Sequence, residues 1–168
     1  MRKIILSVIL ITILVLSVFS IYFQSEATAL GAHVVALKLD TGDTAWMIVA
    51  SALVLIMTPG LGFFYGGMVG KKNVISTMLQ SFMAMVIVTV LWVLVGFGLC
   101  FGPSVGGIIG DPSSNFMFNG VNSTTAWELA PTIPFILFAF FQAKFAIITP
   151  ALITGAFAER VRFWAYLL

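Results

Sequence analysis

A row of aromatic rings lies in one apolar stretch near the end of the sequence. Phe141 and Phe145 are four residues apart, which places them one helical turn from each other. Gln142 and Thr149 fall on the helical face of Phe145. Aromatic ring faces attract cations by about 0.5–2 kcal/mol when water is excluded. This face is therefore a candidate for binding a small cation, although ordinary helix packing produces the same pattern and remains an alternative.

Lys144 is the least expected residue in this stretch. A lysine at the middle of a membrane helix costs about 2.5–3.5 kcal/mol on insertion scales and is for that reason a functional candidate. By helical angle Lys144 lies about 60° from Phe141, so it is a possible perturbation of a cation site there. Three interpretations remain open: a side chain that extends to the membrane surface, one buried in a bundle with partners, or a damaged position.

The composition defines the class of protein in which these residues must act. Of 168 residues, 61% are hydrophobic and 8% are charged, and the mean hydropathy is +1.14. Soluble domains carry about 25% charged residues, so the composition excludes a soluble enzyme and a disordered chain. The net charge of +2 is too small for a nucleic-acid surface. The sequence therefore predicts a membrane protein surrounded by lipid.

Catalytic and metal-binding motifs are absent from the sequence. It has no Ser/His/Asp set, no phosphate-binding loop and no pair of carboxylates within an apolar stretch. Its single cysteine, Cys100, excludes a disulfide framework and a cysteine-based metal site. We therefore expect no enzymatic activity, no cofactor and no metal.

The first 29 residues resemble a secretion signal. Arg2 and Lys3 precede an apolar run over residues 4–23, and Ala27-Thr28-Ala29 offers a cleavage site of small residues. We predict a signal peptide over residues 1–29 that is removed after Ala29, which leaves residues 30–168 as the partial membrane domain. The apolar run is long for a signal peptide, so an uncleaved anchor is the alternative.

Three further stretches are long enough to cross a membrane, which requires about 20 mostly apolar residues. They cover about residues 44–70, 73–101 and 132–158, and residues 102–131 form a polar loop between the last two. The sequence thus predicts an all-α bundle of three membrane helices. Residues 163–168 look like the start of a fourth helix that is too short to span, so we expect the chain to be a truncated N-terminal piece.

Basic residues next to the predicted helices give an orientation. Lys71 and Lys72 separate the first two helices, and Arg160 and Arg162 follow the third. All four lie on one side if three helices cross in sequence, and basic residues near helix ends favour the cytoplasmic side. The mature N-terminus and the loop over residues 102–131 are then external.

Small and polar residues predict close packing between the helices. Gly62, Gly66 and Gly70 follow one another at intervals of four, a spacing typical of helix contacts in membranes. The second helix starts with four polar residues on one face: Asn73, Ser76, Thr77 and Gln80. Because polar groups need partners in hydrocarbon, this face should point into the bundle. It either joins helices or lines a pathway.

A series of ordered motifs resembles the start of the ammonium transporter (Amt/Mep/Rh) family. The motifs are DTAWM from Asp43, MTPGLGFFYGG from Met57, KKNV from Lys71, QSF from Gln80, FQ from Phe141, FAIITPALI from Phe145 and GAFAER from Gly155. The resemblance covers about residues 43–168. It implies the first three helices, and the start of a fourth, of a fold with eleven crossing helices in each subunit of a homotrimer.

The resemblance also implies a mechanism. In the family, an external aromatic cage recruits ammonium, the ion loses its proton, and ammonia passes an apolar pore. Two stacked Phe side chains gate the pore entrance, where Phe145 matches one of them and Phe141 lies one turn outward. The cytoplasmic face of family members often binds a nitrogen regulator of the P-II type. The predicted function is therefore ammonium/ammonia transport.

The sequence also departs from the family pattern. The two pore histidines, the cage tryptophan and the second gate Phe belong to later helices, beyond Leu168. Lys144 stands where the family usually has a small polar residue, and at 4 Å it would repel ammonium by about 4 kcal/mol for an effective dielectric constant near 20. The alternative function is therefore that of a non-conducting remnant or an interaction subunit of a membrane complex.

Overall fold

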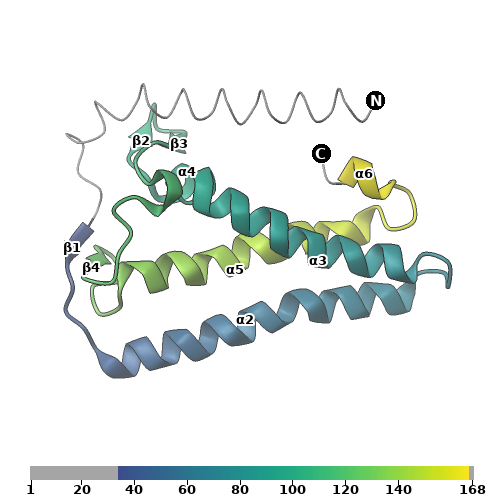
Figure 1. Cartoon of the computed structure of the whole chain (residues 1–168), viewed down its shortest axis with the longest axis horizontal. Helices are drawn as coiled ribbons and strands as arrows, with labels where there is room; N and C mark the ends of the chain where they lie inside the picture. The colour runs from purple at the N-terminus through teal and green to yellow at the C-terminus, as the bar shows by residue number, and fades with distance from the viewer. Residues whose placement is uncertain (1–33, 167–168) are drawn as a thin grey trace.

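Three long helices dominate the computed structural model, which describes residues 34–166 (Figure 1). The predicted signal segment lies outside the described residues. The helices are α2 (Thr41–Met68), α3 (Val74–Leu91), which continues through the π-helical segment Trp92–Gly96 into α4 (Phe97–Phe101), and α5 (Phe135–Ile153), which continues into the 3-10 turn Thr154–Ala156. All three are long and apolar enough to cross a membrane, so the all-α bundle expected from the sequence is confirmed.

Short elements fill the segments between these helices. They are β1 (Val34–Ala36), β2 (Ser104–Val105), β3 (Ile109–Gly110), the 3-10 turn Phe116–Phe118, β4 (Thr125–Trp127) and α6 (Phe163–Tyr166). β2 pairs with β3, and β1 pairs antiparallel with β4 in a register that places Val34 opposite Trp127. The segment before α2 is thereby tied to the long loop at one end of the bundle (Figure 1).

Helix α2 begins three residues earlier than the sequence pattern indicates, because Asp40 caps it. The Asp43 N–H donates to Asp40 Oδ1 at 2.9 Å, and the Thr44 hydroxyl donates to the Asp40 carbonyl oxygen at 2.7 Å. The first of these bonds satisfies a backbone N–H that is otherwise unpaired in the first turn of a helix. Charge spacing marks where the apolar run starts, whereas the cap decides where the helix starts.

Helix α5 begins at Phe135, three residues later than expected. Pro134 immediately precedes it with φ −57°, which is the fixed backbone angle that suits a helix start. The Ile136 N–H donates to the Asn122 carbonyl oxygen at 3.0 Å. The long loop thus supplies an acceptor for the first turn of α5.

The π-helical segment Trp92–Gly96 has no counterpart in the sequence-based expectation. It places Trp92 in the interior, where the indole N–H donates to the Ala139 carbonyl oxygen at 3.1 Å. A wider turn rotates the following residues relative to α3, which brings Phe97 and Phe101 into one aromatic cluster with Trp127. The helix then ends at Phe101 and Gly102, as the sequence Gly102-Pro103 predicts.

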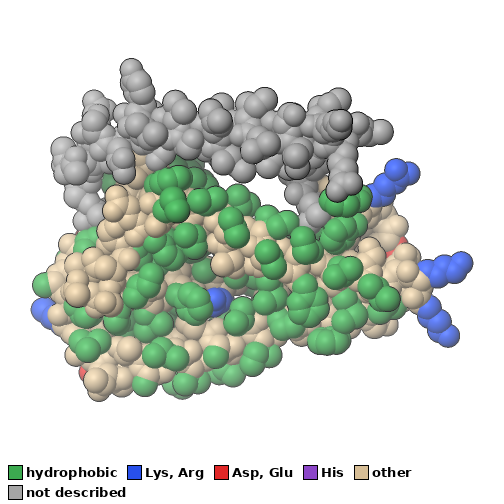
Figure 2. Space-filling model, viewed as in Figure 1, with side chains coloured by type: hydrophobic (Ala, Val, Ile, Leu, Met, Phe, Trp, Pro, Cys, Tyr) green, Lys and Arg blue, Asp and Glu red, His purple; other side chains and the backbone are tan. Residues whose placement is uncertain are grey.

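The aromatic cluster forms the core at the loop end of the bundle. The indole of Trp127 stacks on the Phe135 ring at 5.6 Å and 17° and on the Phe138 ring at 5.7 Å and 8°. Away from this cluster, large apolar side chains such as Phe63 and Ile75 are exposed, and apolar side chains cover much of the visible face (Figure 2). Such an exposed apolar surface suits contact with lipid.

The glycines of α2 differ in what they contact. A Cβ atom added at Gly62 would lie 3.3 Å from the Ser81 Cβ, and one at Gly66 would lie 2.9 Å from the Met78 Cγ, so both glycines face α3. An added Cβ at Gly70 would instead meet a side-chain oxygen of Glu159 at 3.1 Å. Close approach of α2 and α3 therefore depends on the first two glycines.

Only part of the polar face at the start of α3 is buried. Thr77 and Gln80 are buried, whereas Ser76 is exposed. The exposed Asn73 donates from Nδ2 to Glu159 Oε1 at 3.1 Å. Thr77 and Gln80 therefore point into the bundle, whereas Asn73 binds Glu159 in the segment that follows α5.

Candidate functional site: an aromatic cavity at the start of α5

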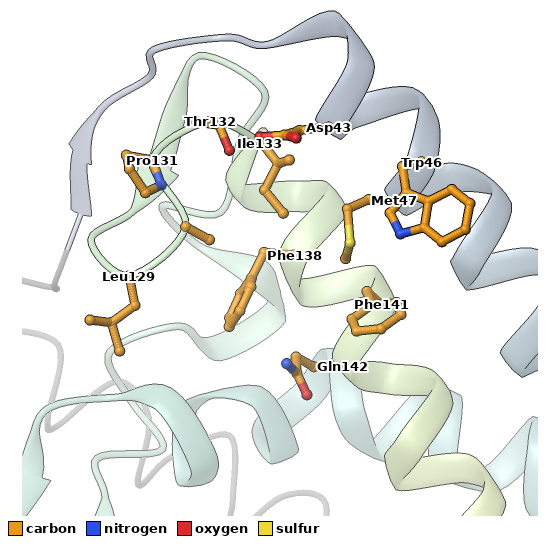
Figure 3. Close-up of a pocket in the computed structure, with 11 residues that line it drawn as sticks. Asp43, Trp46, Met47, Leu129, Pro131, Thr132, Ile133, Phe138, Phe141 and Gln142 are labelled. Atoms are coloured by element: carbon orange, nitrogen blue, oxygen red, sulfur yellow. The ribbon is translucent and has the colours of Figure 1, made fainter.

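A cavity of about 360 Å³ lies where the first turns of α2 and α5 meet the segment that precedes α5. Figure 3 shows side chains from these three parts of the chain around it. Its lining residues are Asp43, Trp46, Met47, Leu129, Ala130, Pro131, Thr132, Ile133, Phe138, Phe141 and Gln142. The cavity thus combines one carboxylate and one amide with several aromatic rings.

Backbone hydrogen bonds hold the three walls of the cavity together. The Lys38 N–H donates to the Pro131 carbonyl oxygen, and the Asp40 N–H donates to the Thr132 carbonyl oxygen, each at 2.9 Å. The same Asp40 caps α2, which fixes the direction in which Asp43 leaves the first turn. The strand-like segment before α2 therefore sets the distance between α2 and the turn over residues 129–133.

The structure brings Phe141 and Gln142 to the cavity, and Phe145 follows one turn further along α5. The rings of Phe141 and Phe145 are 5.1 Å apart at 75°, an edge-to-face pair. Phe145 does not line the cavity and 45% of its surface is exposed. From the cavity, the two rings thus form successive apolar surfaces along one face of α5.

Lys144 lies apart from this row. Its side chain is only 5% exposed, and its Nζ lies 3.3 Å from the centroid of the Phe140 ring. By helical angle Lys144 lies about 40° from Phe140, about 60° from Phe141 and about 100° from Phe145, so it lies on the side of α5 that carries Phe140. The buried ammonium group therefore does not extend to the membrane surface, and it does not line the cavity.

Two cavity residues were not assigned any chemistry by the sequence reasoning. Asp43 and Trp46 lie almost 100 residues before Phe141, and the sequence offers them only as members of a motif. Their type was the available signal: a carboxylate and an indole three residues apart at the start of a membrane helix can contribute to a cation site. That they line the same cavity as Phe141 follows from tertiary structure alone (Figure 3).

At the opposite end of the bundle, hydrogen bonds to Glu159 link the segment after α5 to the turn between α2 and α3. The carboxylate oxygen Oε1 of Glu159 accepts hydrogen bonds from the Gly70 N–H at 2.6 Å and from the Asn73 side chain at 3.1 Å. The hydrogen bonds from Asn73 and Gly70 lower the pKa of Glu159 below its ordinary value of 4.5. The chain after α5 is thereby attached to the turn between α2 and α3.

We expect Glu159→Ala to release the Gly70 amide. Amide hydrogen exchange at Gly70, followed by mass spectrometry, should rise by about tenfold or more because its acceptor is removed. Because the pKa of Glu159 is lowered, the contact is complete above pH 4.5 and is lost as the pH falls through the lowered value. Exchange at Gly70, corrected for its intrinsic rate, should rise over that range in the unaltered chain and not in the variant.

The neighbouring change Arg160→Ala is the matched control, since only the backbone of Arg160 is hydrogen-bonded here, to Phe157. It should leave exchange at Gly70 unchanged. Equal exchange in the Glu159→Ala variant and the unaltered chain would contradict the contact.

The fold and the cavity together define a class of protein. Three membrane-length helices, with a cavity lined by aromatic rings and a carboxylate at one end, are the features of a multi-pass membrane protein. The chain belongs to the ammonium transporter family, because the model described as "Ammonium Transporter Family" matches residues 45–168.

Individual relatives agree with this assignment. The ammonium transporter of Mycobacterium tuberculosis is 51% identical over 142 residues, which cover 77% of this chain and 30% of the relative. That of Aquifex aeolicus is 42% identical over 160 residues, which cover 92% and 34%. The crystal structure of Saccharomyces cerevisiae Mep2 superposes with a TM-score of 0.65 at 34% identity and covers 77% and 28%. The chain thus spans about a third of the length of the curated relatives it matches.

Proposed function

We propose that the chain takes part in ammonium transport, with ammonia as the conducted species, and that the cavity beside α5 is its external vestibule. The observation that carries the proposal is the convergence of the Asp43 carboxylate with the rings of Phe138 and Phe141 around one cavity. A carboxylate attracts a cation and ring faces retain it as water is removed. The names of the relatives, which are ammonium transporters, supply the substrate.

In this proposal Gln142 and the two successive rings act in order along α5. The side-chain oxygen of Gln142 can accept a hydrogen bond from ammonium in the vestibule. Phe141 and then Phe145 form an apolar entrance beyond it, which favours neutral ammonia over the ion because an unpaired charge is costly to bury. Phe145 therefore acts as a gate residue.

A second candidate function rests on Lys144. Its buried cation is one residue from the proposed gate, and a fixed positive charge opposes the entry of ammonium. In this alternative the chain serves as a non-conducting remnant or as an interaction subunit of a membrane complex. The two functions differ in whether uptake depends on the cavity residues of this chain.

We also propose the orientation and assembly of the protein. Lys71, Lys72, Arg160 and Arg162 gather at the end of the bundle that Glu159 closes, and basic residues favour the cytoplasmic side. The cavity and the mature N-terminus are then external. A homotrimer and binding of a P-II type regulator at the cytoplasmic face are proposed from the family resemblance. Orientation is tested in a Cys100→Ser background: a cysteine placed by Lys72→Cys should not be labelled by a membrane-impermeant thiol reagent added outside the cell. Light scattering of the purified complex measures the number of subunits.

The proposed function is tested in cells that lack their own ammonium uptake. The chain is expressed alone, and residues 34–166 are also exchanged into the Mycobacterium tuberculosis relative in place of the matching segment. Growth on limiting ammonium and uptake of labelled methylammonium are measured at equal amounts of protein in the membrane. We expect the chimera to support uptake, and Asp43→Asn to raise its apparent KM about threefold to tenfold because the vestibule loses its charge.

Each outcome favours one of the two functions. An apparent KM unchanged by Asp43→Asn would contradict the vestibule. A chimera that reaches the membrane without any uptake would favour the non-conducting alternative, whereas growth supported by the chain alone would exclude it. Lys38→Gln is the control for Asp43→Asn, because Lys38 is an exposed charge near the same end of α2 that does not line the cavity.

A further inference from the structure

Two buried hydroxyl groups between α2 and α3 have no partner within residues 34–166. Thr58 and Ser81 are both 0% exposed, and neither Thr58 Oγ1 nor Ser81 Oγ has a hydrogen bond within that part of the chain. The side-chain oxygen of Gln80, which is also buried, has none either. A buried polar group without a partner costs about 1–3 kcal/mol, so this cluster requires an explanation.

Other hydroxyl groups in the same helices satisfy themselves locally. The hydroxyls of Ser51, Thr77 and Thr89 each donate to the carbonyl oxygen four residues earlier, at 2.6–2.9 Å. Such a bond is the usual solution for serine and threonine in a membrane helix. Thr58 and Ser81 do not adopt it. The Ser81 Oγ faces α2, since it would lie 3.6 Å from a Cβ added at Gly62, and Thr58 belongs to the same buried set of α2 residues as Gly62.

Helices α2 and α3 approach each other closely beside these two groups. A Cβ added at Gly62 would lie 3.3 Å from the Ser81 Cβ, and Thr58 is one turn from Gly62 on the same buried face of α2. One helical turn is about 5.4 Å, so Thr58 lies about one turn along α2 from the point of contact with Ser81. A water molecule with two hydrogen bonds of about 2.8 Å, set at its roughly tetrahedral angle, joins oxygens about 4.5 Å apart.

A third polar group is available on the same helix. Pro59 has no N–H and therefore cannot donate to the carbonyl oxygen of Leu55, which lies one turn earlier in α2. A buried water typically makes about three hydrogen bonds to polar groups that otherwise lack partners. Thr58, Ser81 and the Leu55 carbonyl oxygen supply that number.

We propose that a water molecule binds between α2 and α3, held by the hydroxyls of Thr58 and Ser81 and by the carbonyl oxygen of Leu55. The water links the two helices at the depth where α2 contains its proline. This internal site is separate from the cavity beside α5, because none of its three residues lines that cavity. It therefore does not depend on the proposed transport function.

The site is tested with the whole chain in proteoliposomes. Water-edited solid-state NMR, with perdeuterated lipid, should show transfer from water to the Thr58 and Ser81 side chains. Ser51 is the internal control, since it is buried on the same helix and its hydroxyl is already bonded to Met47. We expect rapid transfer to the first two residues and little to Ser51.

A double-mutant cycle gives an independent result. Thr58→Val and Ser81→Ala should each lower the equilibrium constant for folding about fivefold to tenfold, since each leaves the water short of a partner. The double variant should lose at most about twofold more, because the two residues share one water. Ser51→Ala combined with Ser81→Ala should instead be additive.

Two results would overturn the proposal. A rise in folding stability on Thr58→Val, with additive effects in the cycle, would mean that the hydroxyls are dry and unpaired. An absence of water transfer to both side chains in the unaltered chain would exclude the water even if the variants fail to fold.

Discussion

Replacing Lys144 with methionine should raise methylammonium uptake by about tenfold in the chimera that carries residues 34–166. The ammonium group of Lys144 is buried against Phe140, where solvent screens it weakly, and it lies one residue from the proposed gate Phe145. Two unit charges about 10 Å apart repel each other by about 1.7 kcal/mol at an effective dielectric constant of 20. An energy of about 1.4 kcal/mol corresponds to tenfold in rate. Uptake is measured with labelled methylammonium and normalised to the protein in the membrane.

The control variants separate charge from shape. Lys144→Arg retains the charge and should not raise uptake, and Lys71→Met removes a charge outside the spans and should have little effect. If Lys144→Arg raised uptake as much as Lys144→Met, shape rather than charge would be responsible. Unchanged uptake in Lys144→Met would remove this residue from the account of transport.

A methyl group at Gly155 should destabilise the bundle by about 1–2 kcal/mol. In the Gly155→Ala variant the new Cβ would lie 2.7 Å from the Tyr65 Cε1, so the ring must move. Movement breaks the hydrogen bond that the Tyr65 hydroxyl donates to the Leu152 carbonyl oxygen at 3.1 Å. The lost hydrogen bond costs about 1 kcal/mol, and the displaced ring adds at most about 1 kcal/mol because Tyr65 is only half-buried. Tryptophan fluorescence during heating should show a midpoint lower by about 2–8 °C.

The matched control is Gly67→Ala in α2, where an added Cβ meets no heavy atom within 4 Å. It should be neutral or slightly stabilising, because alanine favours a helix more than glycine does. In a Tyr65→Leu background the effect of Gly155→Ala should largely disappear. A midpoint unchanged by Gly155→Ala in the unaltered background would show that Tyr65 does not hold α5 in place.

The number and type of the helices could be predicted because they depend on local properties. A run of about 20 apolar residues has few alternatives in a membrane, so charge spacing alone predicts three spans. Their ends were less predictable. The Asp40 cap extends α2 by three residues and Pro134 delays α5 by three, and both effects depend on which backbone groups find partners.

Some residues of the candidate site could be predicted from helical spacing, and others could not. Phe141, Gln142 and Phe145 were predicted to share a region because helical spacing is a property of α5 alone, and the cavity contains the first two. Asp43 and Trp46 line the same cavity because backbone hydrogen bonds attach the segment before α2 to the turn before α5. Contacts across almost 100 residues carry no local periodicity.

The sequence by itself determined a membrane protein of three spans, its family, and the aromatic row of α5, since composition, motif order and helical spacing are all written along the chain. Only the tertiary structure decided the direction of Lys144, the closure of one end by Glu159, and the pairing of Tyr65 with Gly155. These features depend on how helices rotate and approach one another. Packing across the bundle sets that rotation, so the sequence of one helix by itself does not determine it.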